Sequence, residues 1–231
     1  MSDLVPLASL DRRELIRRLA LAITAAGTLD LEAAQHVHQE TSGEKKTRDG
    51  YKVKAFQTHE YQTLRRLVVI IVPADEVSGS ALEAGAPEFI DTLSSQNQEL
   101  ADIFHGGIAW LDAEMRRRYN ATFLAAKPEQ QTAMLDALVA AEKEEHARRN
   151  EELVYRRSPD YKMFSGYTVN RAGSLGPGIK FFDWVRRMTL DAFYTSPIGI
   201  KDLGYKGNRA WSKYEVPQET IDYAIKRSPF A

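Results

Sequence analysis

Cysteine is absent from this 231-residue sequence. Its absence excludes disulfide bonds, thiol catalysis, cysteine-ligated zinc, iron–sulfur clusters and covalently attached c-type haem. The compartment stays open, because a chain of this size buries roughly 70% of its unfolded surface and can form a stable core without disulfides in a reducing or an oxidising environment.

An excess of either charge is also missing. The chain has 31 Lys and Arg residues against 32 Asp and Glu residues, which gives a net charge of -1. A protein that binds nucleic acid in bulk carries a clear basic excess, so we expect no nucleic-acid partner. No uninterrupted apolar stretch reaches the roughly 18 residues that a membrane-spanning helix needs, so none is predicted.

The motifs of nucleotide and flavin binding are missing as well. Gly176-Pro177-Gly178 is followed by Phe181 where a dinucleotide fingerprint needs a third glycine, and no phosphate-binding loop occurs. Ser174 lacks the glycine two residues earlier that a nucleophile elbow requires. The sequence therefore predicts no cofactor in this chain, and the five histidines lack the spacing of a di-metal motif.

What is present at the N-terminus allows two interpretations. Arg12 and Arg13 precede the uncharged, Ala-rich stretch 19–29, a layout that resembles a twin-arginine export signal. The same region also has apolar residues at helical spacing, which predicts an amphipathic helix: Leu15, Leu19, Ala22, Ile23 and Ala26. We therefore describe residues 1–29 as a twin-arginine-like signal or an N-terminal helix.

The remaining chain predicts a mostly α protein. Residues 30–57 are polar and read as an arm or linker, and residues 58–231 as a single helical domain with long ordered loops. Caps, prolines and apolar spacing predict helices at 59–72, 80–85, 87–93, 97–120, 128–149, 179–193, 196–204 and 217–226. Thr58 and Ser80 are the expected caps of the first two.

Three further features carry expectations. Gly106-Gly107 either interrupts its helix or permits another backbone to approach closely. The charged run 142–152 is expected to face solvent, and 156–178 reads as part of a long ordered loop. Asp75 and Glu76 are expected to form a turn after Pro73; the alternative is acid–base chemistry, such as a hydrolase that uses them with His59.

The segment 193–208 combines aromatic residues, three glycines and a proline, and Trp211 and Tyr214 follow it. Tyrosine and tryptophan give large contact areas with a polar tip, as protein interfaces do. The alternative is a loop that packs on its own domain. The residues predicted to bind a partner are Tyr194, Pro197, Tyr205, Asn208 and Trp211.

Several stretches, in order, resemble the gluconate 2-dehydrogenase subunit 3 family. They cover about residues 55–210 and include Phe56-x-x-His59-Glu60-Tyr61, Ile71-Val72-Pro73-Ala74-Asp75-Glu76, Ala84-Gly85-Ala86-Pro87-Glu88-Phe89-Ile90-Asp91, Gly107-Ile108-Ala109-Trp110-Leu111-Asp112, Phe181-Phe182, Phe193-Tyr194-Thr195-Ser196-Pro197-Ile198-Gly199 and Leu203-Gly204-Tyr205-x-Gly207-Asn208.

This resemblance implies a non-catalytic small subunit of a flavin-dependent sugar or sugar-acid dehydrogenase. The implied partner is a large subunit of the glucose–methanol–choline type that holds FAD, and a c-type cytochrome with haem c can accept its electrons. Contact with the membrane would then be indirect, through the complex. The resemblance also implies export to the periplasm by the twin-arginine route; the alternative is a cytoplasmic scaffold whose N-terminal helix packs.

Overall fold

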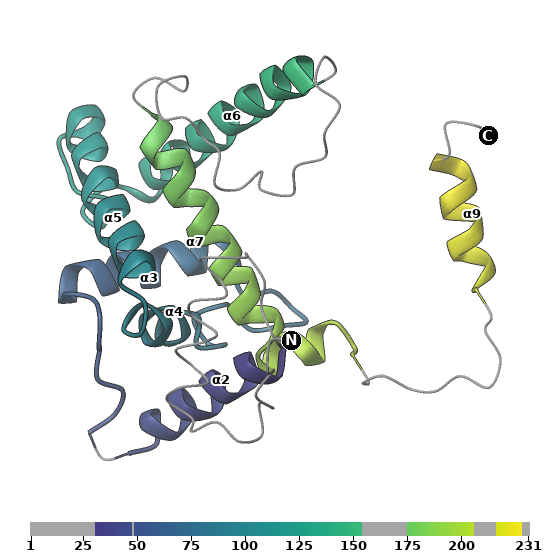
Figure 1. The fold of residues 1–231 in the computed structure, drawn as a ribbon, viewed down its shortest axis with the longest axis horizontal. Coiled ribbons are helices and arrows are strands. Elements are labelled where there is room, and N and C mark those ends of the chain that lie inside the picture. Colours follow the sequence, from purple (N-terminus) through teal and green to yellow (C-terminus); the bar gives the residue numbers. More distant parts are fainter. Residues whose placement is uncertain (1–30, 48, 154–174, 206–215, 228–231) are drawn as a thin grey trace, which may run out of the picture.

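The computed structural model describes residues 31–47, 49–153, 175–205 and 216–227, with the side chains of 146–153 left out. These residues form eight helices and no strand, which confirms the mostly α prediction. Figure 1 shows α2 (Leu31–Lys45), α3 (Thr58–Ile71), α4 (Ala86–Ser94), α5 (Gln98–Tyr119), α6 (Pro128–Leu153), α7 (Gly176–Tyr194), α8 (Pro197–Asp202) and α9 (Gln218–Arg227). None of these helices is long and apolar enough to cross a membrane.

Helix α7 lies at the centre of the molecule. It contacts α3, α4, α5, α6 and α8, and it runs through the middle of the view in Figure 1. Pro177 occupies its first turn, where proline loses no helical hydrogen bond. Its buried apolar residues cover about half of its circumference: Ile179, Phe181, Phe182, Val185, Met188, Ala192 and Phe193. Such a wide apolar face lets one helix pack against several neighbours at once.

Two glycines bring α5 and α7 together. A Cβ atom on Gly107 of α5 would lie 2.0 Å from the ring of Phe181, and one on Gly178 of α7 would lie 2.0 Å from the ring of Trp110. Each helix therefore offers a glycine to an aromatic ring of the other. The helix α5 continues through Gly106 and Gly107, so the expected close approach is found and the expected interruption is not.

The starts of α3 and α4 differ in detail from the sequence-based prediction. Gln57, not Thr58, precedes the first turn of α3, and its backbone N–H donates to Glu60 at 2.8 Å. Ser80 and Glu83 form the expected reciprocal hydrogen bonds, yet residues 81–85 form a turn and no helix. Gly85 has φ +83°, which ends this turn and begins α4, with Pro87 in its first turn as predicted.

The predicted polar arm over 30–57 is wrong for its first half, because residues 31–45 form α2 and pack on α4. The buried stripe of α2 consists of small or polar residues: Ala33, Ala34, Val37, His38 and Thr41. His38 stacks on Phe89 with ring centroids 4.9 Å apart. A stripe with so little apolar area gives a weak helical signal, and Thr41-Ser42-Gly43 is typical of a loop.

The prediction that the charged run 142–152 faces solvent is also only partly correct. Glu142 and Glu145 are buried, and Arg186 of α7 donates two hydrogen bonds to Glu142 at 2.9 and 2.8 Å. Asp183 accepts from the same guanidinium at 3.0 Å. Burial raises the pKa of Asp183, which Arg186 partly offsets. These charges therefore join α6 to α7.

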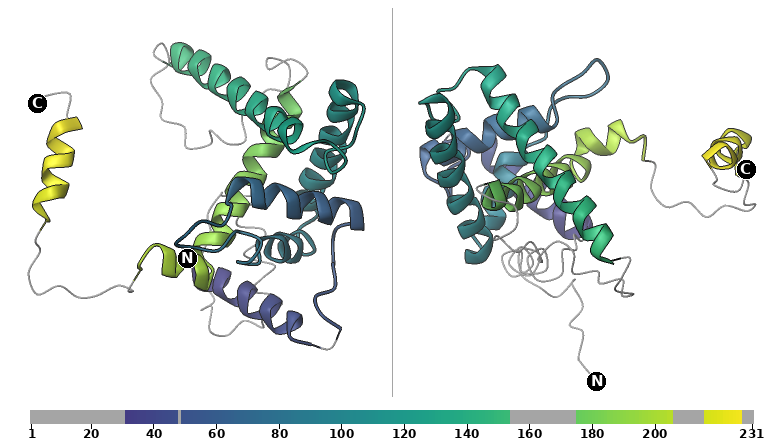
Figure 2. Two further views of the ribbon diagram at one scale, coloured as in Figure 1. Left: turned by 180° about the vertical axis from the view of Figure 1, so that it is seen from behind. Right: turned by 90° about the horizontal axis from the view of Figure 1, so that it is seen from above.

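Helix α9 is set apart from the helical body. None of its residues is buried, and both views in Figure 2 show it away from the other helices. The predicted helix at 217–226 is found, with bounds of 218–227. The chain before α7, residues 154–174, lies outside the described residues, and so does most of the predicted loop 156–178.

Candidate partner-binding site

The polar residues of the sequence motifs bind one another. Asp91 of α4 is fully buried and accepts hydrogen bonds from the Tyr51 hydroxyl at 2.6 Å and from the backbone N–H groups of Lys54, Ala55 and Phe56 at 2.8, 2.9 and 3.2 Å. One carboxylate thus fixes the strand-like segment before α3 against α4. This use satisfies buried backbone donors and leaves no free oxygen for chemistry.

Two histidines of α3 and α5 are paired in the same way. The His59 ring nitrogen Nε2 lies 2.6 Å from Asp112, whose other oxygen accepts from the Phe123 N–H at 2.9 Å. The His105 Nδ1 lies 2.8 Å from Glu60, the residue that caps α3. Asp112 and Glu60 thus each bridge a histidine and a backbone N–H, which is a structural arrangement.

The candidate hydrolase residues do not come together. His59 lies at the start of α3, while Asp75 and Glu76 follow its end, and a 14-residue helix is about 20 Å long. Asp75 is exposed, and one of its oxygens accepts from the N–H groups of Val77 and Ser78 at 2.8 and 2.7 Å. These hydrogen bonds lower its pKa, so Asp75 forms the predicted turn.

The predicted partner-binding residues meet where α7 ends. We use the name C-terminal corner for Tyr194 and the following residues to Tyr205, including α8. Ser196 caps α8 by accepting from the Gly199 N–H at 3.1 Å. A Cβ atom on Gly199 would lie 2.1 Å from the Phe193 carbonyl oxygen, so the tight reversal from α7 to α8 requires glycine. Helix α8 packs against α7 at this reversal.

Three of the five predicted residues can be placed there. Pro197 is exposed in the first turn of α8, and the exposed fractions of Tyr194 and Tyr205 are 40% and 47%. Their neighbour Phe193 is 2% exposed and packs edge-on against Tyr194, with ring centroids 5.1 Å apart. Asn208 and Trp211 lie outside the described residues, as do the export-signal residues Arg12 and Arg13.

A groove of about 840 Å³ separates the C-terminal corner from α2. Each wall combines residues of one helix with residues that follow its end, and we call the feature the α2–α8 groove. The α2 wall consists of Gln35, Gln39, Ser42 and Lys46, and the opposite wall of Pro197, Ile200, Lys201, Gly204 and Tyr205. Both charges on the walls are positive, and the floor is formed by His38 and Thr195.

The floor residues form a buried polar pair. His38 Nε2 lies 3.0 Å from the Thr195 hydroxyl, which itself donates to the Asp191 carbonyl at 2.6 Å. Burial lowers the pKa of His38 from 6.5 to about 4, against the opposing effect of the Ala192 carbonyl. His38 is therefore neutral at pH 7 and couples α2 to the end of α7 without adding charge to the groove.

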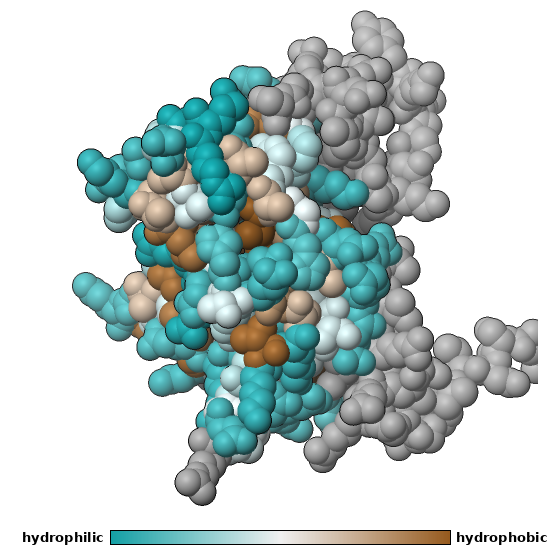
Figure 3. All heavy atoms as spheres, turned by 90° about the vertical axis from the view of Figure 1, so that its left-hand side faces the viewer, coloured by the Kyte–Doolittle hydropathy of each residue, from teal (hydrophilic) through white to brown (hydrophobic). Residues whose placement is uncertain are grey.

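Exposed large apolar side chains gather in the C-terminal part of the chain. Of the eleven such residues in the described regions, eight lie at or after position 190: Leu190, Tyr194, Leu203, Tyr205, Val216, Ile221, Tyr223 and Ile225. By contrast, the face seen in Figure 3, on the α3 and α5 side, has small hydrophobic patches separated by hydrophilic residues. This uneven distribution is typical of a chain that contacts a partner through one region.

Sequence reasoning missed the α2 wall of this site. Because Ala33, Ala34 and Val37 carry little apolar surface, the segment reads as polar. The signal that could have found it is the spacing of Ala34, Val37, His38 and Thr41, which lie on one helical face. Among the described residues, no group of three His, Asp or Glu side chains is placed to hold a metal ion.

A comparison with protein families identifies the family of this chain. A model described as gluconate 2-dehydrogenase subunit 3 matches residues 58–217, more than half of the chain. The chain belongs to the gluconate 2-dehydrogenase subunit 3 family. The family description names a subunit of a dehydrogenase, so the protein is one component of a multi-subunit enzyme. No curated protein and no solved structure matched the chain.

The bounds of the family match divide the site. The C-terminal corner lies within residues 58–217, whereas α2 and α9 lie outside them. One wall of the α2–α8 groove therefore belongs to the part matched by the gluconate 2-dehydrogenase subunit 3 model, and the other wall lies before it.

Proposed function

We propose that this chain is the non-catalytic small subunit of a flavin-dependent sugar or sugar-acid dehydrogenase, which it stabilises and helps to export. The catalytic partner is a large subunit of the glucose–methanol–choline type that carries FAD, and a c-type cytochrome with haem c receives the electrons. The clustering of exposed apolar residues at and beyond the C-terminal corner supports this function most directly.

The internal use of the polar motif residues adds support. Asp91, Asp112 and Glu60 each accept hydrogen bonds from backbone N–H groups, so the recognisable motifs maintain the fold. Because these motif residues already bind groups of their own chain, the exposed aromatic residues are the side chains best suited to binding another subunit. Aromatic residues in the centre of an interface typically contribute most of its affinity.

The docking part of the proposal can be tested with matched variants. Tyr194→Ala should weaken association with the large subunit about thirtyfold, or ~2 kcal/mol, and leave the melting temperature of the free subunit nearly unchanged. The control is Val77→Ala, because Val77 is 81% exposed in a turn far along the chain from the corner. Affinity is measured by titration of the purified subunits. Equal affinities for the two variants would contradict docking at the corner.

The identity of the partner has its own test. The tagged chain, purified from its native host, should retain a large subunit with a flavin absorption band, while the isolated chain should be colourless and inactive towards sugars. A flavin band that stays with the chain through gel filtration without a second polypeptide would contradict a non-catalytic role.

Export is tested separately through the paired arginines. Arg12→Lys with Arg13→Lys should retain the dehydrogenase in the cytoplasm, because the twin-arginine route requires the pair. The activity is measured in periplasmic and cytoplasmic fractions of cells that produce the whole complex. Normal periplasmic activity in the double variant would contradict the export signal and favour the alternative of an N-terminal amphipathic helix.

A further inference from the structure

Helix α9 has an apolar stripe that contacts nothing in the described structure. Ile221, Ala224 and Ile225 lie on one side of this ten-residue helix, and Ile221 and Ile225 are 37% and 56% exposed. An isolated helix shorter than about 12 residues is marginal in water, so α9 needs a surface to remain folded. The stripe gives the side of α9 that such a surface would cover.

The α2–α8 groove offers a matching surface. Pro197, Ile200 and Tyr205 supply apolar contacts, and Lys46 and Lys201 supply two positive charges without a negative one among the lining residues. On α9, Asp222 borders the apolar stripe and Glu219 lies one turn earlier. The acidic residues thus lie in the N-terminal half of α9 and the basic residues Lys226 and Arg227 in its last turn, so the N-terminal half of this amphipathic helix complements the lysines of the groove.

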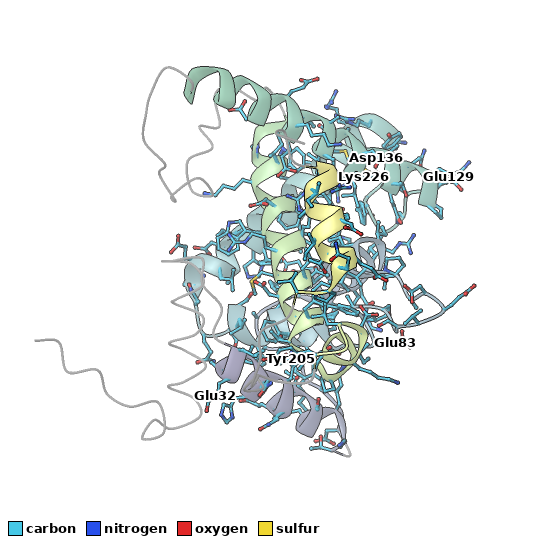
Figure 4. All side chains as sticks on the ribbon, turned by 90° about the vertical axis from the view of Figure 1, so that its right-hand side faces the viewer. Glu32, Glu83, Glu129, Asp136, Tyr205 and Lys226 are labelled. Carbon is cyan, nitrogen blue, oxygen red and sulfur yellow. The ribbon has the colours of Figure 1, made fainter. Side chains whose placement is uncertain are left out.

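The tether brings the two features within reach. Tyr205 lines the groove, and α9 begins at Gln218. The twelve residues between them span at most about 40 Å, and a short tether gives an effective concentration of about 1 mM. In the projection of Figure 4, Tyr205 lies just above α2, and Lys226 lies on α9. Because the tether starts at the groove itself, α9 of the same chain is the favoured occupant.

We propose that α9 docks into the α2–α8 groove of its own chain, with Ile221 and Ile225 pointing into the groove between Ser42 of α2 and Ile200 of α8. The charges set its direction. Glu219 and Asp222 precede Lys226 and Arg227 along α9, whereas Glu32 precedes Lys45 and Lys46 along α2. Opposite charges therefore meet when α9 runs antiparallel to α2.

Docking in this direction covers Pro197 and Tyr205 and presents Tyr223 as the exposed aromatic residue beside them. Tyr223 lies about 200° around the helix from Ile221, so it faces solvent when the apolar stripe is covered. The inference does not rest on the proposed dehydrogenase function, because both helices belong to the free chain. Tyr194 does not line the groove, so its variant reports on the dehydrogenase interface and the groove variants report on α9.

The absence of cysteine makes a disulfide test direct. Ser42→Cys combined with Ile221→Cys should form an intramolecular disulfide under mild oxidation, because docking holds the two backbones within the about 5–6 Å that the bond requires. The matched control combines Ser42→Cys with Tyr223→Cys, which has nearly the same tether and faces the other way. We expect the first pair to close about tenfold faster than the second, since the docked face alone presents its thiol.

Each outcome decides the matter. Faster closure of the Ile221→Cys pair in monomeric, full-length chain supports docking. Equal rates for the two pairs would overturn it, and a disulfide between two chains at rising concentration would assign the groove to α9 of a second copy. Both variants must keep the melting temperature of the unmodified chain, which is expected because Ser42 and Tyr223 are exposed and Ile221 is not buried.

A charge exchange gives an independent measurement. Asp222→Lys should speed amide hydrogen exchange in α9 several-fold, and the added Lys46→Glu substitution should restore slow exchange in the full-length chain. Exchange that is equally fast in all three proteins, at the rate of an unstructured peptide, would overturn the proposal.

Discussion

Around α3, α4 and α5, polar side chains bind one another, whereas at the C-terminal corner and α9 apolar side chains face solvent. The polar groups of the body satisfy buried backbone donors, and those contacts would be lost if the same residues served a substrate. The exposed apolar groups of the corner give the free subunit little stability. The comparison teaches that the polar motif residues of the body maintain the fold, whereas the aromatic residues of the corner are available to other molecules.

The strongest test of the body is removal of the Asp91 carboxylate. Asp91→Ala leaves the N–H groups of Lys54, Ala55 and Phe56 without their acceptor, and we expect a loss of about 4 kcal/mol of unfolding free energy. Denaturant unfolding of the free subunit measures this loss. Asp75→Ala is the control, because Asp75 is exposed and water can replace it. Similar unfolding free energies for the two variants would mean that the buried Asp91 carboxylate stabilises the fold no more than the exposed Asp75 carboxylate.

The next largest effect concerns pH and the floor of the groove. The folded pKa of His38 is about 4, below its unfolded value of 6.5. The unfolded state therefore takes up a proton first as the pH falls, and stability should be full above pH 6.5 and decline towards pH 4 by up to about 3 kcal/mol. His38→Gln should flatten this decline, while His36→Gln on the same helix should not. Parallel pH profiles for all three proteins would argue against a buried neutral His38.

Adjacent glycines of α5 provide a smaller and sharper contrast. Gly107→Ala places a methyl group into the Phe181 ring and should cost about 1–3 kcal/mol, because the packed core must shift. Gly106→Ala meets no atom within 4 Å and should stabilise the helix by up to about 1 kcal/mol. Thermal unfolding measures both effects. Equal destabilisation by Gly106→Ala and Gly107→Ala would mean that the contact with Phe181 is not the cause.

The smallest effect on the free subunit is expected at the corner. Tyr205→Ala should change the unfolding free energy by about 0.5 kcal/mol or less, since Tyr205 is 47% exposed. The corresponding core substitution Phe104→Ala should cost about 3–5 kcal/mol, because Phe104 is fully buried. If Tyr205→Ala lowered the unfolding free energy almost as much as Phe104→Ala, Tyr205 would belong to the hydrophobic core and not to an exposed surface.

Most of the helical body was predictable because its signals are local. Pro87, Pro128 and Pro197 mark helix starts, and wide apolar faces identify α5 and α7. The helix α2 was not predictable as part of the body, because its buried face depends on small residues that fit Phe89 of α4. The turn at 81–85 was missed because a correct capping box was followed by a Gly85 that ends it at once.

The site was predictable only by composition. Aromatic and glycine content pointed to the corner, and the structure exposes Tyr194 and Tyr205 there. The groove forms between α2 and α8, which are about 150 residues apart in sequence. On its floor, His38 pairs with Thr195, which lies 157 residues later in the chain. No local pattern encodes such a distance, so Gln39, Ser42 and Lys46 could be recognised as wall residues only once the fold was known.

The reciprocal contacts of α5 and α7 have a mechanical consequence. Gly107 meets Phe181 and Trp110 meets Gly178, so the positions rise along α5 as they fall along α7, and the helices are antiparallel in a fixed register. Sliding in either direction would drive one ring against a backbone. The corner begins about 20 Å further along α7, so a pull applied there is resisted along the helix axis.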